Sequence, residues 1–494
     1  MSNPFNPAAR QCRPLFFLMA IATITFSDVK AQSKNPYSYQ DLSQLFYGKQ
    51  KDSIKKNWSC PALYTDKNTQ KKYKEIWDSR TDFITGAMEN NNYVFQQDIY
   101  NYLSGIIEDI VKKNSKLIPG KPILLIDRSA AANAYAIGGN MIVVNLGLLS
   151  FAKYREDIAF VIAHELSHNI FNHADNFMKE KAQWLTSDEY KNSLNAVLDS
   201  KYERFSRLKK VFEGYSFNRS KHQRYHESDA DSLAIVLLKQ SNIPFDASFF
   251  LRLDSSDIQY KQPLQKPVKE YFTAYSLPFE DWWTQKRSKG LSTKNYNFRD
   301  TTGLQDSLKT HPECKDRYAK SLSLSDINAQ HTAVPASIQE TANKMLIWNM
   351  YDNMSLTACL YRILLEKDKG NTDSWYDFML HNIFAGLYYN DRQLHRFNAI
   401  SVTPKEYISQ NYYELQNMLE QIPRETLEQY YKGLMNQGFW QHQTADAKGL
   451  KNFMSTMILD PTDSDKVKAV AAKEFLTSYS TSMYCEFAEH FKKK

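Results

Sequence analysis

Apolar side chains recur at the three- and four-residue spacing of α-helices along most of this chain. In residues 95–114 the recurring positions are Ile99, Leu103, Ile106, Ile107 and Ile110. A second helix is predicted over residues 155–174, and it is so apolar that it must be buried. A third apolar helix is predicted over residues 224–240. The chain is therefore expected to be mostly helical.

The pattern changes only between residues 121 and 145. The run PILLID (122–127) and the run NAYAIGGNMIVVN (133–145) are typical of short strands, and a glycine pair interrupts the second run. Two or three strands are predicted here. The fold class that follows is α+β and mostly helical, with a small β-sheet in the core and an all-α C-terminal domain.

Changes in pattern divide the chain into four parts. We expect a leader at 1–31, a helical N-terminal region at 32–119, a central domain at 120–325 and a helical C-terminal domain at 326–494. In the central domain, residues 175–222 are charged and helical and are interpreted as an insertion or lid, whereas residues 253–306 show no clean periodicity. The C-terminal helices are expected to stack as hairpins. Because no fixed repeat of about 34 residues is visible, tetratricopeptide-like packing stays an open alternative.

The leader has the features of a signal peptide. Arg10 and Arg13 precede an apolar run at 14–26, and the small residues Val29 and Ala31 predict cleavage after Ala31. The run is shorter than the roughly 20 residues of a membrane span. A retained signal anchor is the alternative. No later stretch approaches a span, so we expect a mature chain that is soluble and either periplasmic or secreted.

Composition narrows the classes of function. Glycine (15) and proline (16) are scarce, which argues against a turn-rich all-β sandwich. The formal net charge is +7, and removing the leader, with three basic residues and one acidic residue, leaves +5. These charges are spread along the chain, so no nucleic-acid partner is expected. Four cysteines remain without a CxxC pair, and their three pairings into two disulfides stay open: Cys60, Cys314, Cys359 and Cys485.

One motif carries recognisable chemistry. The run His164-Glu165-Leu166-Ser167-His168 matches HExxH inside a predicted helix. Residues four apart share a helix face, so His164 and His168 converge on one metal ion, and Glu165 reaches a water on that ion. Two histidines and a glutamate in an apolar helix are costly to bury unless they are paired or bind metal. We expect one Zn²⁺ per chain. Histidines held by hydrogen bonds in the core are the alternative.

Catalytic zinc needs a third protein ligand and one open position. The pattern HExxHxxGxxH does not supply that ligand, because Phe171 and Ala174 stand at its last two fixed positions. Downstream, ESDAD places Glu227 and Asp231 four residues apart on one helix face. We predict that Glu227 is the third ligand and that Asp231 accepts a hydrogen bond from a ligand histidine. For Glu227 the alternative is an exposed acidic turn.

These motifs, together with NAYA (133–136), the glycine pair and GLL (147–149), resemble those of the HtpX and CaaX-prenyl-protease family of zinc metallopeptidases. The resemblance covers about residues 95–325 and implies a gluzincin-like zinc peptidase core. His173 stands where the family often has histidine, and it is given a supporting role outside the ligand set. The membrane-embedded relatives have several spans and this chain has none, so prenylated substrates are not implied.

A second resemblance concerns the soluble periplasmic, BepA-like branch of that family. The run Thr310-His311-Pro312 with Arg317 downstream is similar to an element of that branch. It implies that His311 acts as a latch on the open zinc position and that Arg317 is an active-site partner. His311 follows Glu227 by 84 residues, a spacing that the irregular segment between them lengthens.

The expected activity is that of an exported zinc-dependent endopeptidase. Zinc lowers the pKa of its bound water toward ~7 and polarises the scissile carbonyl, while Glu165 takes the proton of that water and passes it to the leaving amine. Tyr225, His226 and Arg317 are candidates to stabilise the oxyanion. Extended or misfolded polypeptide is the expected substrate, added as a further strand on an open edge. That edge is assigned to Asn133, Ala134, Tyr135 and Ala136, or to the neighbouring strand at 140–145.

Two other functions are considered. One is a zinc-stabilised chaperone or assembly factor whose helical C-terminal domain binds protein partners and whose proteolysis is latent. The other is a hydrolase that uses HExxH on a bond other than a peptide bond.

Overall fold

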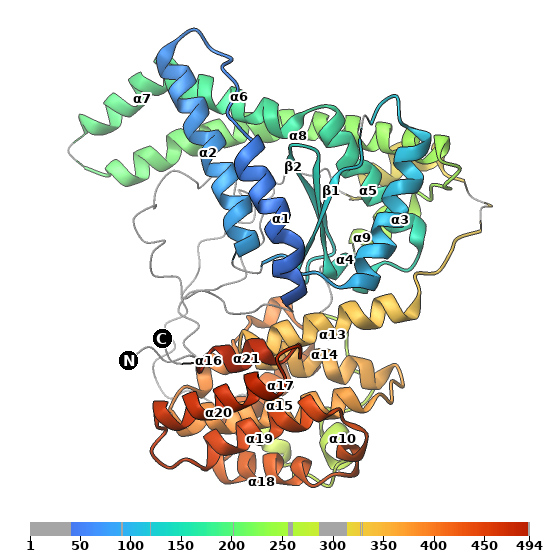
Figure 1. The fold of residues 1–494 in the computed structure, drawn as a ribbon, viewed down its shortest axis with the longest axis vertical. Helices are drawn as coiled ribbons and strands as arrows, with labels where there is room; N and C mark the ends of the chain where they lie inside the picture. The colour runs from blue at the N-terminus through green and yellow to red at the C-terminus, as the bar shows by residue number, and fades with distance from the viewer. Residues whose placement is uncertain are drawn as a thin grey trace.

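The computed structural model describes residues 41–89, 92–118, 120–200, 202–254, 260–285, 314–326, 328 and 330–492 (Figure 1). The predicted signal peptide and His311 lie outside these residues. Among the helices described, none combines the length and apolar character that crossing a membrane requires.

The described part of the N-terminal region contains three helices: α1 (Asp41–Asn57), α2 (Lys67–Glu89) and α3 (Gln97–Lys113). The last of them is the amphipathic helix predicted within 95–114, and all five of its recurring apolar residues are buried. It is capped by the preceding residue, Gln96, whose side chain accepts a hydrogen bond from the backbone N–H of Ile99. Its apolar face packs into the main core of the molecule.

Among the described residues, the sheet has three strands, in the order β1-β3-β2. They are β1 (Ile123–Asp127), β2 (Ala134–Gly138) and β3 (Met141–Asn145), with β1 parallel to β3 and β2 antiparallel to it. All of β3 is buried between its two neighbours, as expected for a short continuous apolar run. Segment 140–145 therefore cannot serve as an open edge, and that alternative is wrong. The NAYA segment leads into β2, which is an edge strand.

Five helices follow the sheet: α4 (Leu146–Phe151), α5 (Arg155–Ile170), α6 (His173–Thr186), α7 (Asp188–Leu198) and α8 (Arg204–Gln240). The predicted helix over 155–174 is too long, because α5 ends at Ile170. Asn172 adopts a left-handed conformation with φ 55°, which helix interiors do not tolerate, and a new helix starts after it. The helix predicted from residue 224 is the last part of α8, which spans 37 residues.

The next described elements are short: α9 (Ser248–Asp254), α10 (Val268–Thr273), η4 (Asp281–Thr284), α12 (Cys314–Ser321) and η5 (Leu322–Leu324). Segment 260–285 lies among the C-terminal helices, where α10 is labelled in Figure 1. Phe272 packs edge-on against Phe384, at 5.8 Å between ring centroids. Tyr260 packs in the same way against Tyr412, at 5.4 Å. Tertiary aromatic contacts therefore place this irregular segment with helices that come more than 100 residues later.

The rest of the described chain is helical: α13 (Ala336–Asp352), α14 (Leu356–Asp368), α15 (Ser374–Arg392), α16 (Arg396–Ile400), η6 (Lys405–Tyr407), α17 (Gln410–Gln421), α18 (Arg424–Met435), η7 (Gly438–His442), α19 (Ala445–Leu459), α20 (Asp465–Ser478) and α21 (Cys485–Glu489). The predicted fold class is confirmed: one small sheet within helices, followed by an all-helical region. The first helix of this region, α13, packs against α4, and one hydrophobic core continues across the junction. Among the residues that the structure describes, no disulfide joins any two of the four cysteines named above.

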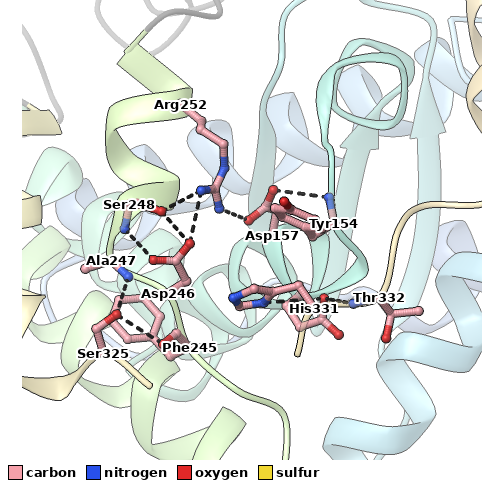
Figure 2. Close-up of polar contacts among 11 residues, drawn as sticks. Tyr154, Asp157, Phe245, Asp246, Ala247, Ser248, Arg252, Ser325, His331 and Thr332 are labelled. Atoms are coloured by element: carbon pink, nitrogen blue, oxygen red, sulfur yellow. Dashed lines mark hydrogen bonds and ion pairs between the residues drawn. The ribbon is translucent and has the colours of Figure 1, made fainter. Parts of the chain in front are cut away.

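Polar contacts anchor the beginning of α5, as Figure 2 shows. Arg252 of α9 reaches Asp157 in the first turn of α5, at 2.5 Å, and Asp246, at 3.0 Å. The backbone N–H of Thr332 donates to the carboxylate of Glu156, at 2.9 Å. The segment that leads into α13 is therefore hydrogen-bonded to the helix that carries the HExxH motif.

Candidate metal centre

The candidate metal centre lies where α5 packs against α8. His164 and His168 come from α5, and Glu227 comes from α8. Nε2 of His164 lies 3.0 Å from Nε2 of His168 and 3.2 Å from Oε2 of Glu227. Nε2 of His168 lies 3.5 Å from Oε1 of Glu227. Two ring nitrogens and one carboxylate therefore meet at a single point, within 4.8 Å of one another.

These separations fit a zinc ion. Zinc bonds of about 2.0–2.1 Å at tetrahedral angles place neighbouring ligand atoms about 3.3 Å apart. The three separations given above, 3.0, 3.2 and 3.5 Å, lie close to that value. Two imidazoles and one carboxylate are also a ligand set that catalytic zinc uses, with a fourth position left for water. Glu227 is only 6% exposed, so it does not lie in an exposed acidic turn.

The site is buried, and its charges act on one another strongly. His164 and Glu165 are 5% and 6% exposed. Burial alone would lower the pKa of His164, but the carboxylates of Asp231 and Glu227 raise that pKa to about 10. A histidine so close to two carboxylates holds a positive charge readily, and a divalent cation would take the place of that proton. Glu165 follows His164 on α5 and is buried as well, and it stands at the motif position that supplies the general base.

Asp231 supports His164 from the side away from Glu227. One of its carboxylate oxygens lies 2.9 Å from Nδ1 of His164, the nitrogen that does not face the other ligands. Arg317 of α12 donates two hydrogen bonds to the same carboxylate, at 2.8 and 2.6 Å. Burial would raise the pKa of Asp231, yet the bond to His164 and the charge of Arg317 lower it below its ordinary range. The carboxylate therefore stays ionised and can fix the tautomer of His164.

Arg317 is buried, and its guanidinium lies 4.5 Å from the ring centroid of Phe250. Burial would lower its pKa, but the carboxylate of Asp231 raises it above the ordinary value. Because this guanidinium is committed to Asp231, Arg317 acts through that carboxylate. The oxyanion role proposed for it is not favoured by this placement.

His173 supports the second ligand histidine. Its Nδ1 lies 2.7 Å from Nδ1 of His168, and its ring stacks on His226 with centroids 4.3 Å apart. In an unbroken helix these two residues, five apart, would point about 140° away from each other. The turn at Asn172 returns the ring of His173 to the side of α5 that carries His168. Burial and the neighbouring His226 lower the pKa of His173 to about 4, so its ring is neutral and can accept a hydrogen bond.

The predicted edge segment lies beside this centre. Strand β2 packs against α5, and Tyr135 is half-buried and donates to the carboxylate of Asp127, at 3.1 Å. Asn133 precedes the strand, and its carbonyl accepts from the backbone N–H of Asn145. The side chain of Tyr225 and the whole of His311 lie outside what the structure describes.

Sequence reasoning missed one group of residues close to the centre. Arg80 of α2 donates to Asp175 of α6, two residues after His173. The glycine pair at 138–139 was the only signal of it, because that pair leaves room for side chains from a distant part of the chain.

A comparison with known protein families agrees with this geometry. Residues 100–324 match the family model described as peptidase family M48, and the match contains all three residues of the metal cluster. No curated protein matches the chain. The resemblance to HtpX and the CaaX-prenyl proteases is confirmed at the level of the family, whereas the BepA-like branch stays a prediction. Over residues 100–324, the chain is thus similar to the metallopeptidases of peptidase family M48.

Proposed function

We propose that this protein is an exported, zinc-dependent endopeptidase that cleaves extended or misfolded polypeptides. The observation that carries the proposal is the meeting of His164, His168 and Glu227 at separations suited to one zinc ion. The adjacent, buried Glu165 supplies the base that peptide hydrolysis requires. Export rests on the predicted signal peptide, and N-terminal sequencing of secreted or periplasmic protein would test it by the appearance of Gln32 as the first residue.

The chemistry divides between the ion and the chain. When bound, zinc supplies a site that acidifies a water and polarises a peptide carbonyl. Glu165 accepts the proton released by the attacking water and then delivers it to the leaving amine. Asp231 and His173 each hold one ligand imidazole by its other ring nitrogen, so both rings keep their orientation through the reaction.

The substrate proposal rests on the edge strand. The outer edge of β2 has no strand paired with it among the residues that the structure describes. An extended peptide can add there through backbone hydrogen bonds, which read strand conformation more than sequence. A folded protein offers few segments that are free to pair in this way, so unfolded or extended chains are the favoured class.

The test is proteolysis of fluorescent casein by purified protein, with and without chelator. We expect chelation to abolish cleavage and added zinc to restore it. Glu165→Gln should keep its zinc and lose roughly 10²–10⁴-fold in rate, because the general base is gone. Glu180→Gln, which changes an exposed glutamate on α6, is the matched control and should cleave normally. Full activity of Glu165→Gln would rule out the proposed base.

A chaperone or assembly factor with latent proteolysis is the second candidate. One observation favours it: the helical region from α13 to α21 extends over residues 336–489 but contributes none of the three residues of the metal cluster. Glu165→Gln separates the two functions. If that variant complements a deletion strain, binding through the helical region is the main function. If it does not complement the strain, hydrolysis is the main function.

A further inference from the structure

Arg80 stands at the centre of a cluster that lies outside the metal centre. Its guanidinium lies against the rings of Trp58 and Trp77, at 4.5 and 4.3 Å from the two ring centroids. One of its nitrogens donates to the carboxylate of Asp175, at 2.8 Å. The Arg80 side chain is only 12% exposed. A cation in this position is attracted to the faces of both indoles as well as to the carboxylate.

This cluster also fixes the end of the edge strand. Gly138 ends β2 and Gly139 begins the turn to β3, with φ of 80° and 59°. A Cβ at position 138 would lie 2.7 Å from Nη1 of Arg80, and one at position 139 would overlap the ring of Trp58. Only glycine meets both demands, since it accepts the positive φ and leaves room for these side chains.

Arg80 is connected to the metal cluster through Asp175 and His173. Its partner Asp175 lies in the first turn of α6, which begins at His173. With zinc on Nε2 of His168, Nδ1 of that ring carries the ring proton. It then donates a hydrogen bond to Nδ1 of His173, which lies 2.7 Å away. The place of the first turn of α6 therefore decides whether that hydrogen bond forms.

The other end of α6 is held separately. The hydroxyl of Tyr64 donates to the carbonyl of Lys179, at 3.3 Å, and the hydroxyls of Thr69 and Thr186 are 2.9 Å apart. Since these contacts hold the later turns, Arg80 controls the first turn and not the helix as a whole.

We propose that Arg80 is a positioning residue of the metal centre, which holds His173 against the ligand His168 by fixing the first turn of α6 through Asp175. The inference rests on the proposed zinc site and deepens it. It makes the N-terminal helices part of the working peptidase, although α2 lies outside the segment that matches the family model.

The test is a double-mutant cycle on zinc affinity, measured in the full chain by competition with a chromophoric chelator. His173→Phe keeps a stacking ring and removes the accepting nitrogen, and it should weaken zinc binding about 10–100-fold. Arg80→Gln alone should weaken zinc binding by roughly threefold or more. In the His173→Phe background, Arg80→Gln should change the affinity by less than about 1.5-fold, because the bond through which it acts is already lost.

Arg396→Gln is the matched control. Arg396 has the same 12% exposure and pairs with Asp391 at 2.7 Å, far along the chain in the helical region. Its loss should lower the melting temperature without changing zinc affinity. If Arg80→Gln does not fold, Asp175→Asn breaks the same ion pair with less change in volume and takes its place in the cycle.

The outcomes are distinct. Loss of affinity only when His173 is present supports the proposal. Unchanged affinity, or an equal loss in both backgrounds, overturns it and leaves the proposed function standing. A wild-type chain that binds no zinc overturns both.

Discussion

Acid should destabilise this protein through a single histidine in the helical region. His381 of α15 is fully buried, with its ring edge-on to Trp440 at 4.9 Å and near Tyr431 at 5.6 Å. Burial lowers the pKa of His381 from 6.5 to about 3, although Asn382 acts in the opposite direction. At neutral pH the ring is uncharged in the folded and the unfolded chain, so its protonation does not affect the free energy of unfolding there.

The sign and size follow from proton linkage. Below about pH 6.5 the unfolded chain binds a proton at this ring, whereas the folded chain does not until the pH approaches 3. The contribution of the uncharged His381 to the free energy of unfolding is therefore fully present above about pH 6.5. It is lost progressively as the pH falls from about 6.5 to about 3. At about pH 4.5 the loss from His381 amounts to roughly 2–3 kcal/mol, since each pH unit between the two pKa values costs about 1.4 kcal/mol.

The perturbation is His381→Phe, which keeps a ring in the aromatic cluster and cannot titrate. The assay is urea unfolding, followed by tryptophan fluorescence, at about pH 7 and pH 4.5. When the pH falls from about 7 to about 4.5, the free energy of unfolding of the wild-type chain should decrease by roughly 2–3 kcal/mol more than that of the variant. His442→Gln, which alters an exposed histidine of the same region, should not change the pH dependence. An equal loss in wild type and His381→Phe would refute the reasoning.

Further predictions concern packing around the metal centre. Arg317→Met should cost about 3–5 kcal/mol in the free energy of unfolding measured by urea titration, because it leaves the carboxylate of Asp231, which is only 13% exposed, without its cation. Adding Asp231→Leu should recover much of that stability, and a double variant as unstable as Arg317→Met would contradict this. Gly139→Ala should cost about 2–4 kcal/mol, since it combines a positive φ with overlap on Trp58, whereas Gly86→Ala in α2, with open space around it, should be neutral or stabilising in thermal melts. Equal melting temperatures for the two glycine variants would argue against the tight turn.

The parts of the site that sequence predicts well are those set by local geometry. His164 and His168 share a helix face because of their spacing alone, and the same rule pairs Glu227 with Asp231. The strands follow from apolar runs bounded by polar and glycine residues. These features need no knowledge of tertiary structure, and the structure brings the two motifs together as the HExxH chemistry required.

What sequence could not supply depends on a single backbone angle or on distant contacts. The positive φ at Asn172 ends α5 early and turns His173 back to His168, yet the apolar pattern runs on past it. Trp58 and Arg80 meet the glycine pair only after the N-terminal helices pack. Aromatic contacts place residues 260–285 among the C-terminal helices, and no periodicity announces such contacts.

The central claim is that Glu227 completes a zinc site with the two histidines of α5. Its most direct test is the zinc content of purified protein by elemental analysis, for the wild type, Glu227→Ala and Asp229→Ala. Asp229 lies two residues away on the same helix and is exposed, so it is the matched control. We expect one zinc per chain in the wild type and in Asp229→Ala, and almost none in Glu227→Ala. Full zinc content in Glu227→Ala would contradict the account.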